Sequence, residues 1–318
     1  KSLYFTLSAH NYLASRKPEW IAAHNDAQSM EDFFHAGQDG TIWRKLDRQF
    51  HFDAILLCGD PSEFQPLLSY LTMSPDMTLV YLDHTSLIFM RSPAKPWTPD
   101  NLHELKEKFA SYPKLDRANF LTKLATNLIA AGRGTLAKQT LDESLSLDSN
   151  SPDTWTQLAH YDAQTNNLSG ALDEIDRALK LDPGNYYALT TRVRVLQFMK
   201  RYQDAMRASN DLLKTRPDDS MLLYQHVMVA HDAAKAGVSS YREEINTLRH
   251  LIDIVSAQKQ PVSGFRIYLA QAYEMDGQAT AALDEFQQAL DEGSLSDEQE
   301  ELIQKQMKSI EKQLSQTP

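Results

Sequence analysis

The sequence predicts a small α/β domain with a mixed sheet, followed by an all-α solenoid in which pairs of short helices form an α–α superhelix. The solenoid is indicated by Ala137, Ala171 and Ala205, which follow one another at a step of 34 residues. The stretch around each alanine has the apolar spacing of two short helices. The α/β domain is indicated by short apolar runs that alternate with amphipathic helices in the first 93 residues.

The predicted sheet lies within the first 93 residues. Strands are expected at 3–7, within 52–60, and at 77–82 and 86–90, the last two forming an antiparallel hairpin. Ile42, Leu46 and Phe50 are spaced four residues apart, which predicts an amphipathic helix. Short helices are expected within 18–36, and Asp60 is expected to cap a helix that begins at Pro61.

Three features of this domain could carry chemistry, and for each we favour a structural role. Gly59-Asp60 follows a strand, where many α/β enzymes bind ligands, but no glycine-rich loop accompanies it. Asp83-His84 has the composition of a dyad but lies in the predicted hairpin turn. Cys58 is the single cysteine and lies in an apolar strand, which predicts a buried, unreactive thiol and no internal disulfide.

A proline-rich connector and tandem repeats follow the sheet. Ser92 to Asp100 contains three prolines, and Thr98 is expected to cap a helix that begins at Pro99. The predicted domains are an α/β domain at 1–93, a proline-rich linker and bridging helix at 94–117, five repeats at 118–296 and a C-terminal capping helix at 297–318. The repeats are expected at 118–151, 152–185, 186–219, 220–262 and 263–296.

The fourth repeat and the last helix depart from the pattern. Ala205 and Ala282 are 77 residues apart, nine more than two periods of 34, so the fourth repeat is irregular. The insertion is either a tolerated lengthening of a loop or the place where binding specificity lies. In the last helix we expect an inward apolar face that caps the solenoid, formed by Leu302, Met307, Ile310 and Leu314.

The repeats resemble the tetratricopeptide family. Residues 152–185 match its pattern at Trp155, Leu158, Ala171, Ala178 and Pro183, and Ala159 replaces the usual early glycine. The resemblance implies that the first helix of each pair lines a concave groove that binds a protein or peptide. Projected onto this sequence, the candidate groove residues are Thr126, Thr156, His160, Tyr187, Thr190, Arg194, Gln197, Tyr224, Met228, His231 and Gln271. A solvated, unused face is the alternative.

Residues 40–91 carry a second resemblance. Phe50-His-Phe-Asp53 leads into an apolar strand and a capped helix, and the hairpin strands end in Asp83 and Arg91. This order is similar to the small domain that follows the membrane-embedded part of bacterial polytopic glycosyltransferases of the dolichyl-phosphate-mannose mannosyltransferase type. Met77 stands where those chains usually have tryptophan. The resemblance implies an extracytoplasmic location beside a catalytic membrane region.

Charge and motifs narrow the function. The net charge of −11 argues against nucleic acid and against docking on anionic lipid. No apolar run approaches the ~20 residues of a membrane helix, and no Walker, Gly-x-Ser-x-Gly or His-Glu-x-x-His motif occurs. We therefore expect no catalytic residue, metal or cofactor.

The sequence predicts a non-catalytic interaction or scaffolding module that binds a protein or peptide partner. Because the chain begins at Lys1, we expect it to be a region of a larger membrane-anchored or exported bacterial protein, periplasmic or otherwise extracytoplasmic, with a cytoplasmic location as the alternative. The alternative function is an accessory domain of a membrane glycosyltransferase, in which the α/β domain binds a sugar or nucleotide.

Overall fold

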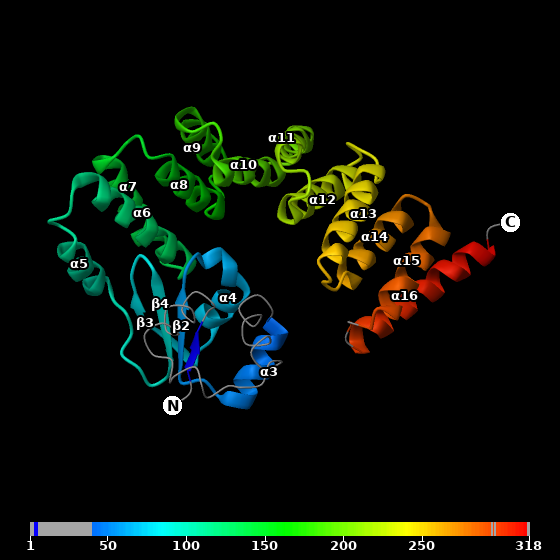
Figure 1. Ribbon diagram of the computed structural model, residues 1–318, viewed down its shortest axis with the longest axis horizontal. Helices are drawn as coiled ribbons and strands as arrows, with labels where there is room; N and C mark the ends of the chain where they lie inside the picture. The colour runs from blue at the N-terminus through cyan, green and yellow to red at the C-terminus, as the bar shows by residue number, and fades with distance from the viewer. Residues whose placement is uncertain (1–2, 6–39, 294, 296, 317–318) are drawn as a thin grey trace. The chain divides into compact units, whose positions relative to one another are not determined.

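The computed structural model describes residues 3–5, 40–293, 295 and 297–316. Over these residues a four-stranded sheet is followed by a succession of helical hairpins (Figure 1). The predicted fold class is confirmed, while the helices expected within 18–36 lie outside the described residues. The chain divides into two compact units, one made of 1–167 with 176–182 and the other of 168–175 with 183–318. The domain boundaries drawn from the sequence stay a prediction.

The sheet of the first unit is mixed, as the sequence predicts. Its strands are β1 (Leu3–Phe5), β2 (Ala54–Cys58), β3 (Met77–Leu82) and β4 (Ser86–Arg91), in the spatial order β1-β2-β4-β3. Strand β1 is parallel to β2, with Leu3 opposite Ala54, and the other pairs are antiparallel. Alternation along β2 buries Ile55 and Leu57. The same alternation leaves Cys58 half-buried, so the expectation of a buried thiol is wrong in degree.

Helices α3 (Gly40–Phe50) and α4 (Gln65–Met73) supply apolar side chains to this core. Trp43 is fully buried, and its ring lies 5.5 Å from that of Phe52. Asp47 Oδ1 lies 2.6 Å from Nη2 of Arg91, which ties α3 to β4. The expected helix start at Pro61 is corrected, because a 3₁₀ turn (Pro61–Phe64) precedes α4. Pro66 has no N–H to donate to the carbonyl of Ser62, so the α-helix begins only at Gln65.

The proline-rich connector packs against the sheet. The N–H of Trp97 donates to the carbonyl of Leu79 at 2.7 Å, and the Trp97 side chain is buried. Thr98 and Asn101 then form a capping box at the start of α5 (Pro99–Lys108), as the sequence predicts for this cap. The connector therefore covers part of the edge strand β3.

The first helical hairpin shares its core with the sheet. It consists of α6 (Lys114–Ala130) and α7 (Gly134–Leu147), and α8 (Pro152–Gln164) follows. The amide of Asn127 donates to the carbonyl of Asp83 at 2.8 Å. The ring of His84 lies 5.0 Å from that of Phe120. One apolar cluster consequently extends from Trp43 in α3 to Leu158 in α8.

The 34-residue step appears in the structure as repeated backbone signals. Ser151, Asn185 and Asp219, at successive steps of 34, cap the first helices of three hairpins with side-chain oxygens that accept backbone N–H groups. Gly132, Asn166 and Lys200 end the first helices of three hairpins with positive φ values of 71, 64 and 58°. The residue after each donates its N–H five residues back, to Leu128, Asp162 and Leu196 respectively. These caps and turns explain why the chain folds back at equal intervals.

The second unit consists mainly of three helical hairpins. They are α10 (Tyr186–Phe198) with α11 (Tyr202–Thr215), α12 (Ser220–Lys235) with α13 (Arg242–Ala257), and α14 (Ser263–Met275) with α15 (Ala279–Asp291); α9 (Leu168–Leu181) contains residues of both units. Ala205 and Ala282 have no exposed surface, as expected for positions where paired helices approach closely. The apolar side chains form separate clusters along the unit.

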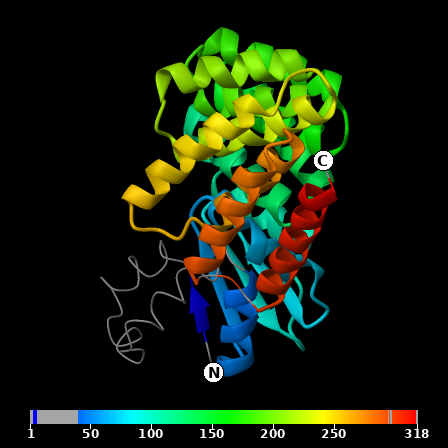
Figure 2. The same ribbon diagram turned by 90° about the vertical axis from the view of Figure 1, so that its right-hand side faces the viewer.

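The last helix, α16 (Asp297–Gln316), packs beside α15 (Figures 1 and 2). Its inward face differs from the expectation. Ile303 and Ile310 are buried, whereas Leu302 and Leu314 are 65% and 43% exposed. Leu302 lies about 100° around the helix from Ile303. Leu314 lies near the end of a helix of 20 residues that packs on one of 13.

Candidate functional site

The predicted groove residues of the first unit offer little free side-chain surface. Thr156 on α8 is buried, and its hydroxyl donates to the carbonyl of Pro152 at 2.8 Å. Thr126 on α6 is half-buried and donates to the carbonyl of Thr122. His160 is half-buried on α8, with Nε2 3.0 Å from Nε2 of Gln164. We therefore look for the candidate surface in the second unit.

The second unit brings together the predicted residues of α10, α12 and α14. Gln197 on α10 donates to Asp232 Oδ2 at 2.6 Å on α12, and Gln225 on α12 donates to the carbonyl of Thr190 at 2.8 Å. The ring of Tyr224 on α12 lies 6.1 Å from that of Phe265 on α14. Burial raises the pKa of Tyr224, and the neighbouring Tyr268 raises it further. These contacts hold the three first helices side by side.

Exposed apolar side chains recur on these first helices. We call the surface formed by the outward residues of α10, α12 and α14 the first-helix face. Tyr187 is 59% and Met228 38% exposed, and Arg194 is also exposed. Thr190, His231 and Gln271 are half-buried on the same three helices. Whether this face binds a partner stays a prediction.

Sequence reasoning missed further exposed apolar side chains on these helices. Met221 is 69% exposed and lies 34 residues after Tyr187, so the repeat step itself could have found it. Phe198 and Met275 end α10 and α14 and are 58% and 60% exposed. Large apolar groups left in water at recurring helix positions are a common mark of an interaction surface.

His231 of the first-helix face rests on a buried acid. Its Nδ1 lies 3.1 Å from Oε1 of Glu244 on α13, whose side chain is 4% exposed. Burial raises the pKa of Glu244, the charge and hydrogen bond of His231 lower it, and Asp232 raises it. The histidine is therefore anchored by a carboxyl group that burial favours in its neutral form.

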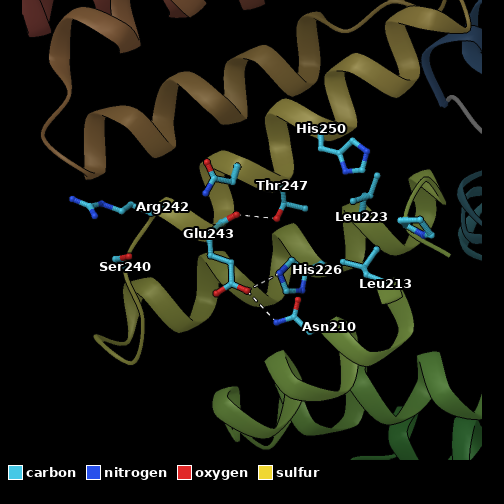
Figure 3. A pocket seen from close by; sticks show the side chains of 11 residues that line it. Asn210, Leu213, Leu223, His226, Ser240, Arg242, Glu243, Thr247 and His250 are labelled. Carbon is cyan, nitrogen blue, oxygen red and sulfur yellow. Dashed lines mark hydrogen bonds and ion pairs between the residues drawn. The ribbon is translucent and has the colours of Figure 1, made fainter. Parts of the chain in front are cut away.

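A pocket of about 540 Å³ lies beside α11, α12 and α13 (Figure 3). Its lining includes Leu213, Leu223, His226, Glu243 and His250. Leu223 and His226 lie on a different side of α12 from Tyr224 and Met228, because successive helical residues are turned by about 100°. We call this site the α11–α13 pocket. It combines three helices of the irregular region, and no motif in the sequence indicates it.

A hydrogen-bonded chain crosses the α11–α13 pocket (Figure 3). Ser209 Oγ lies 2.7 Å from His226 Nδ1, and His226 Nε2 lies 3.2 Å from Glu243 Oε1. Asn210 Nδ2 donates to the same oxygen at 3.1 Å. Burial lowers the pKa of His226, although the charge of Glu243 acts in the opposite direction. The neutral ring can accept from Ser209 and donate to Glu243.

The features considered in the α/β domain have structural partners. Asp83 Oδ1 accepts the N–H groups of Thr85 and Ser86 at 2.8 Å each, which closes the hairpin turn. Burial lowers the pKa of His84, which packs against aromatic rings. Burial also raises the pKa of the Cys58 thiol, whose sulfur lies 3.2 Å from Ser86 Oγ.

Two searches of the described residues bear on metals and membranes. No cluster of three or more His, Cys, Asp or Glu side chains in the described part is arranged to hold a metal ion. None of the described helices is both long and apolar enough to cross a bilayer.

Helical hairpins that begin at a capped residue and turn at a left-handed residue, both at steps of 34, decide the type of repeat. The repeats are tetratricopeptide-like. Solved structures with a similar fold include YrrB, described as a tetratricopeptide protein with an unusual peptide-binding site, with 16% identity, a TM-score of 0.44 and coverage of 61% of this chain and 91% of that chain.

Two other tetratricopeptide structures are similar over comparable lengths. PilW, described as a widely conserved type IV pilus biogenesis factor, has 16% identity and a TM-score of 0.49, covering 61% of this chain and 85% of its own. A fragment of MamA from Desulfovibrio magneticus RS-1 has 17% identity and a TM-score of 0.48, covering 57% and 97%. No protein-family model and no curated protein matches the sequence.

Proposed function

We propose that this chain is a non-catalytic interaction module whose first-helix face binds an extended segment of a protein partner. The observation that carries the proposal is the recurrence of exposed Tyr187, Met221 and Met228 on adjacent first helices. Aromatic and methionine side chains are enriched where proteins bind one another, since they bury a large apolar area. Gln197 and Gln225 bridge α10 and α12, so the face is held in place before a partner arrives.

A peptide selection tests this proposal. A displayed peptide library is selected on the full chain, and the affinity of the recovered peptides is compared between the wild type and the triple variant Tyr187→Ala, Met221→Ala, Met228→Ala. We expect a loss of about 100-fold, since truncated interface anchors cost upwards of ~1 kcal/mol each. The matched control is Leu302→Ala, which removes an apolar side chain of 65% exposure on α16.

The outcome separates the first-helix face from other surfaces. Equal affinity for the wild type and the triple variant would contradict the proposal. An equal loss in the Leu302→Ala variant would show that the effect is not specific to α10 and α12. Unchanged thermal unfolding of the triple variant would confirm that the substitutions act on the surface.

We also propose that the module is the extracytoplasmic region of a larger membrane-anchored or exported bacterial protein. The support is the resemblance of residues 40–91 to the small domain of polytopic glycosyltransferases, which also keeps a role as an accessory domain open. The test is fractionation of cells that carry the native protein with an epitope tag in the loop near Gly237, whose backbone is exposed. Recovery in the cytoplasmic fraction alone would contradict this location.

A further inference from the structure

We propose that the α11–α13 pocket is a second binding site, which takes the cationic side chain of an arginine or lysine of a protein partner, with Glu243 as its acceptor. The site lies on a different side of α12 from the first-helix face. It does not depend on the function proposed for that face.

The carboxylate of Glu243 is held in one orientation from behind. Its Oε1 atom accepts hydrogen bonds from Asn210 at 3.1 Å and from His226 at 3.2 Å. His226 is only 1% exposed, and its other nitrogen is held by Ser209 at 2.7 Å. A group fixed by residues of three helices loses little freedom on binding, which favours the bound state.

The front of the same carboxylate is open. The Glu243 side chain is 41% exposed, and within the described part of the chain hydrogen bonds are recorded only to its Oε1 atom. Arg242, the neighbouring cation, extends away from Glu243 (Figure 3). Because burial lowers the pKa of His226, this ring holds the carboxylate without neutralising it at pH 7. A negative charge therefore faces the pocket.

The remaining walls suit an alkyl chain with a charged end. Leu213, Pro217 and Leu223 supply apolar surface, along which the stems of arginine and lysine pack while the charged end remains polar. The volume of about 540 Å³ lies in the usual range for ligand sites of roughly 300–1,000 Å³. A metal ion fits less well, since the described residues offer no cluster of three or more His, Cys, Asp or Glu ligands.

The first test uses a matched pair of small probes. N-acetyl-arginine methylamide and its uncharged citrulline counterpart are titrated into the full chain. Binding is followed by the NMR signals of the His226 ring and of the Leu213 and Leu223 methyl groups. We expect saturable shifts with the arginine probe and about tenfold weaker binding of citrulline, since hydrogen bonds to charged groups are the stronger ones. Equal binding of both probes, or no binding of either, would overturn the proposal.

Two variants locate the acceptor. Glu243→Gln keeps the shape of the side chain and should weaken arginine binding about tenfold. Asp253→Asn removes an equal charge from the exposed surface of α13 and should leave binding unchanged. Undiminished arginine binding by a folded Glu243→Gln variant would refute the role of Glu243. If that variant does not fold, the salt dependence of the wild type decides, because screening must weaken binding of arginine more than of citrulline.

A last comparison distinguishes a protein partner from a free small cation. A pentapeptide with arginine between two leucines should bind more tightly than the capped arginine, because the neighbouring leucines add apolar contact with the rim. Equal or weaker binding of the pentapeptide would favour a free cation and overturn the assignment to a protein partner. The triple variant of Tyr187, Met221 and Met228 should bind the arginine probe normally, so failure of either proposal can be recognised separately.

Discussion

The two units use the same kind of helical hairpin in different ways. In the first unit, the hairpin α6–α7 packs on a sheet, and one apolar cluster joins Trp43 of α3 to Leu158 of α8. In the second unit the apolar side chains divide into several clusters along the chain. A hairpin that contacts only its neighbours contributes stability locally, whereas one that joins a sheet shares a single core. Identical repeat signals therefore give a cooperative unit in one place and a modular one in the other.

The largest effect should come from a matched pair of buried phenylalanines. Phe89 in β4 and Phe286 in α15 are 2% and 0% exposed, and replacing either by alanine should cost ~3–5 kcal/mol. The comparison predicts that hydrogen exchange accelerates throughout α3–α8 in Phe89→Ala but mainly within α14–α16 in Phe286→Ala. Equally wide loss of protection in both variants would show that the second unit is as cooperative as the first.

An intermediate effect should appear on acidification. Burial lowers the pKa of His226 from its ordinary value of 6.5, so the folded second unit binds a proton less readily than the unfolded chain. The resulting stability is present above pH 6.5 and is lost as pH falls below it, by up to about 1.4 kcal/mol for each unit of pKa difference. Urea unfolding between pH 7.5 and 5 should show this decline.

Two variants sharpen the pH comparison between the units. His226→Gln should flatten the decline of the second unit. His84→Gln should do the same to a smaller extent for the first unit, because burial lowers the pKa of His84 but its side chain is only half-buried. An unchanged pH dependence in His226→Gln would mean that other groups cause the decline.

The smallest effect compares two equivalent turns. Lys200 has a φ of 58° at the end of α10, and Asn166 has a φ of 64° at the end of α8. Glycine adopts this conformation without steric cost and asparagine tolerates it, whereas lysine is disfavoured there. Lys200→Gly should raise the free energy of unfolding by about 0.5–1 kcal/mol, and Asn166→Gly should change it little. Thermal and urea unfolding measure both, and a larger gain at Asn166 would contradict the strain at Lys200.

The sequence was most informative where the signal is local. The spacing of Ala137, Ala171 and Ala205 predicted hairpins that the structure contains, and Thr98 caps α5 as expected. It was less informative where one side chain competes with another. Leu302 and Ile303 are adjacent apolar residues at the start of α16, and only packing on α15 determines that Ile303 is buried. Pro66 likewise overrode the helix start expected at Pro61.

By itself the sequence determined the repeat step, the class of fold and the positions of caps and turns, because these depend on interactions within a few residues of each other. Only the tertiary structure decided that the first hairpin shares a core with the sheet. It also placed Ser209, His226 and Glu243 in one hydrogen-bonded chain. Those three residues come from separate helices of an irregular repeat, and the distance between such side chains is set by helix packing, which no local spacing encodes.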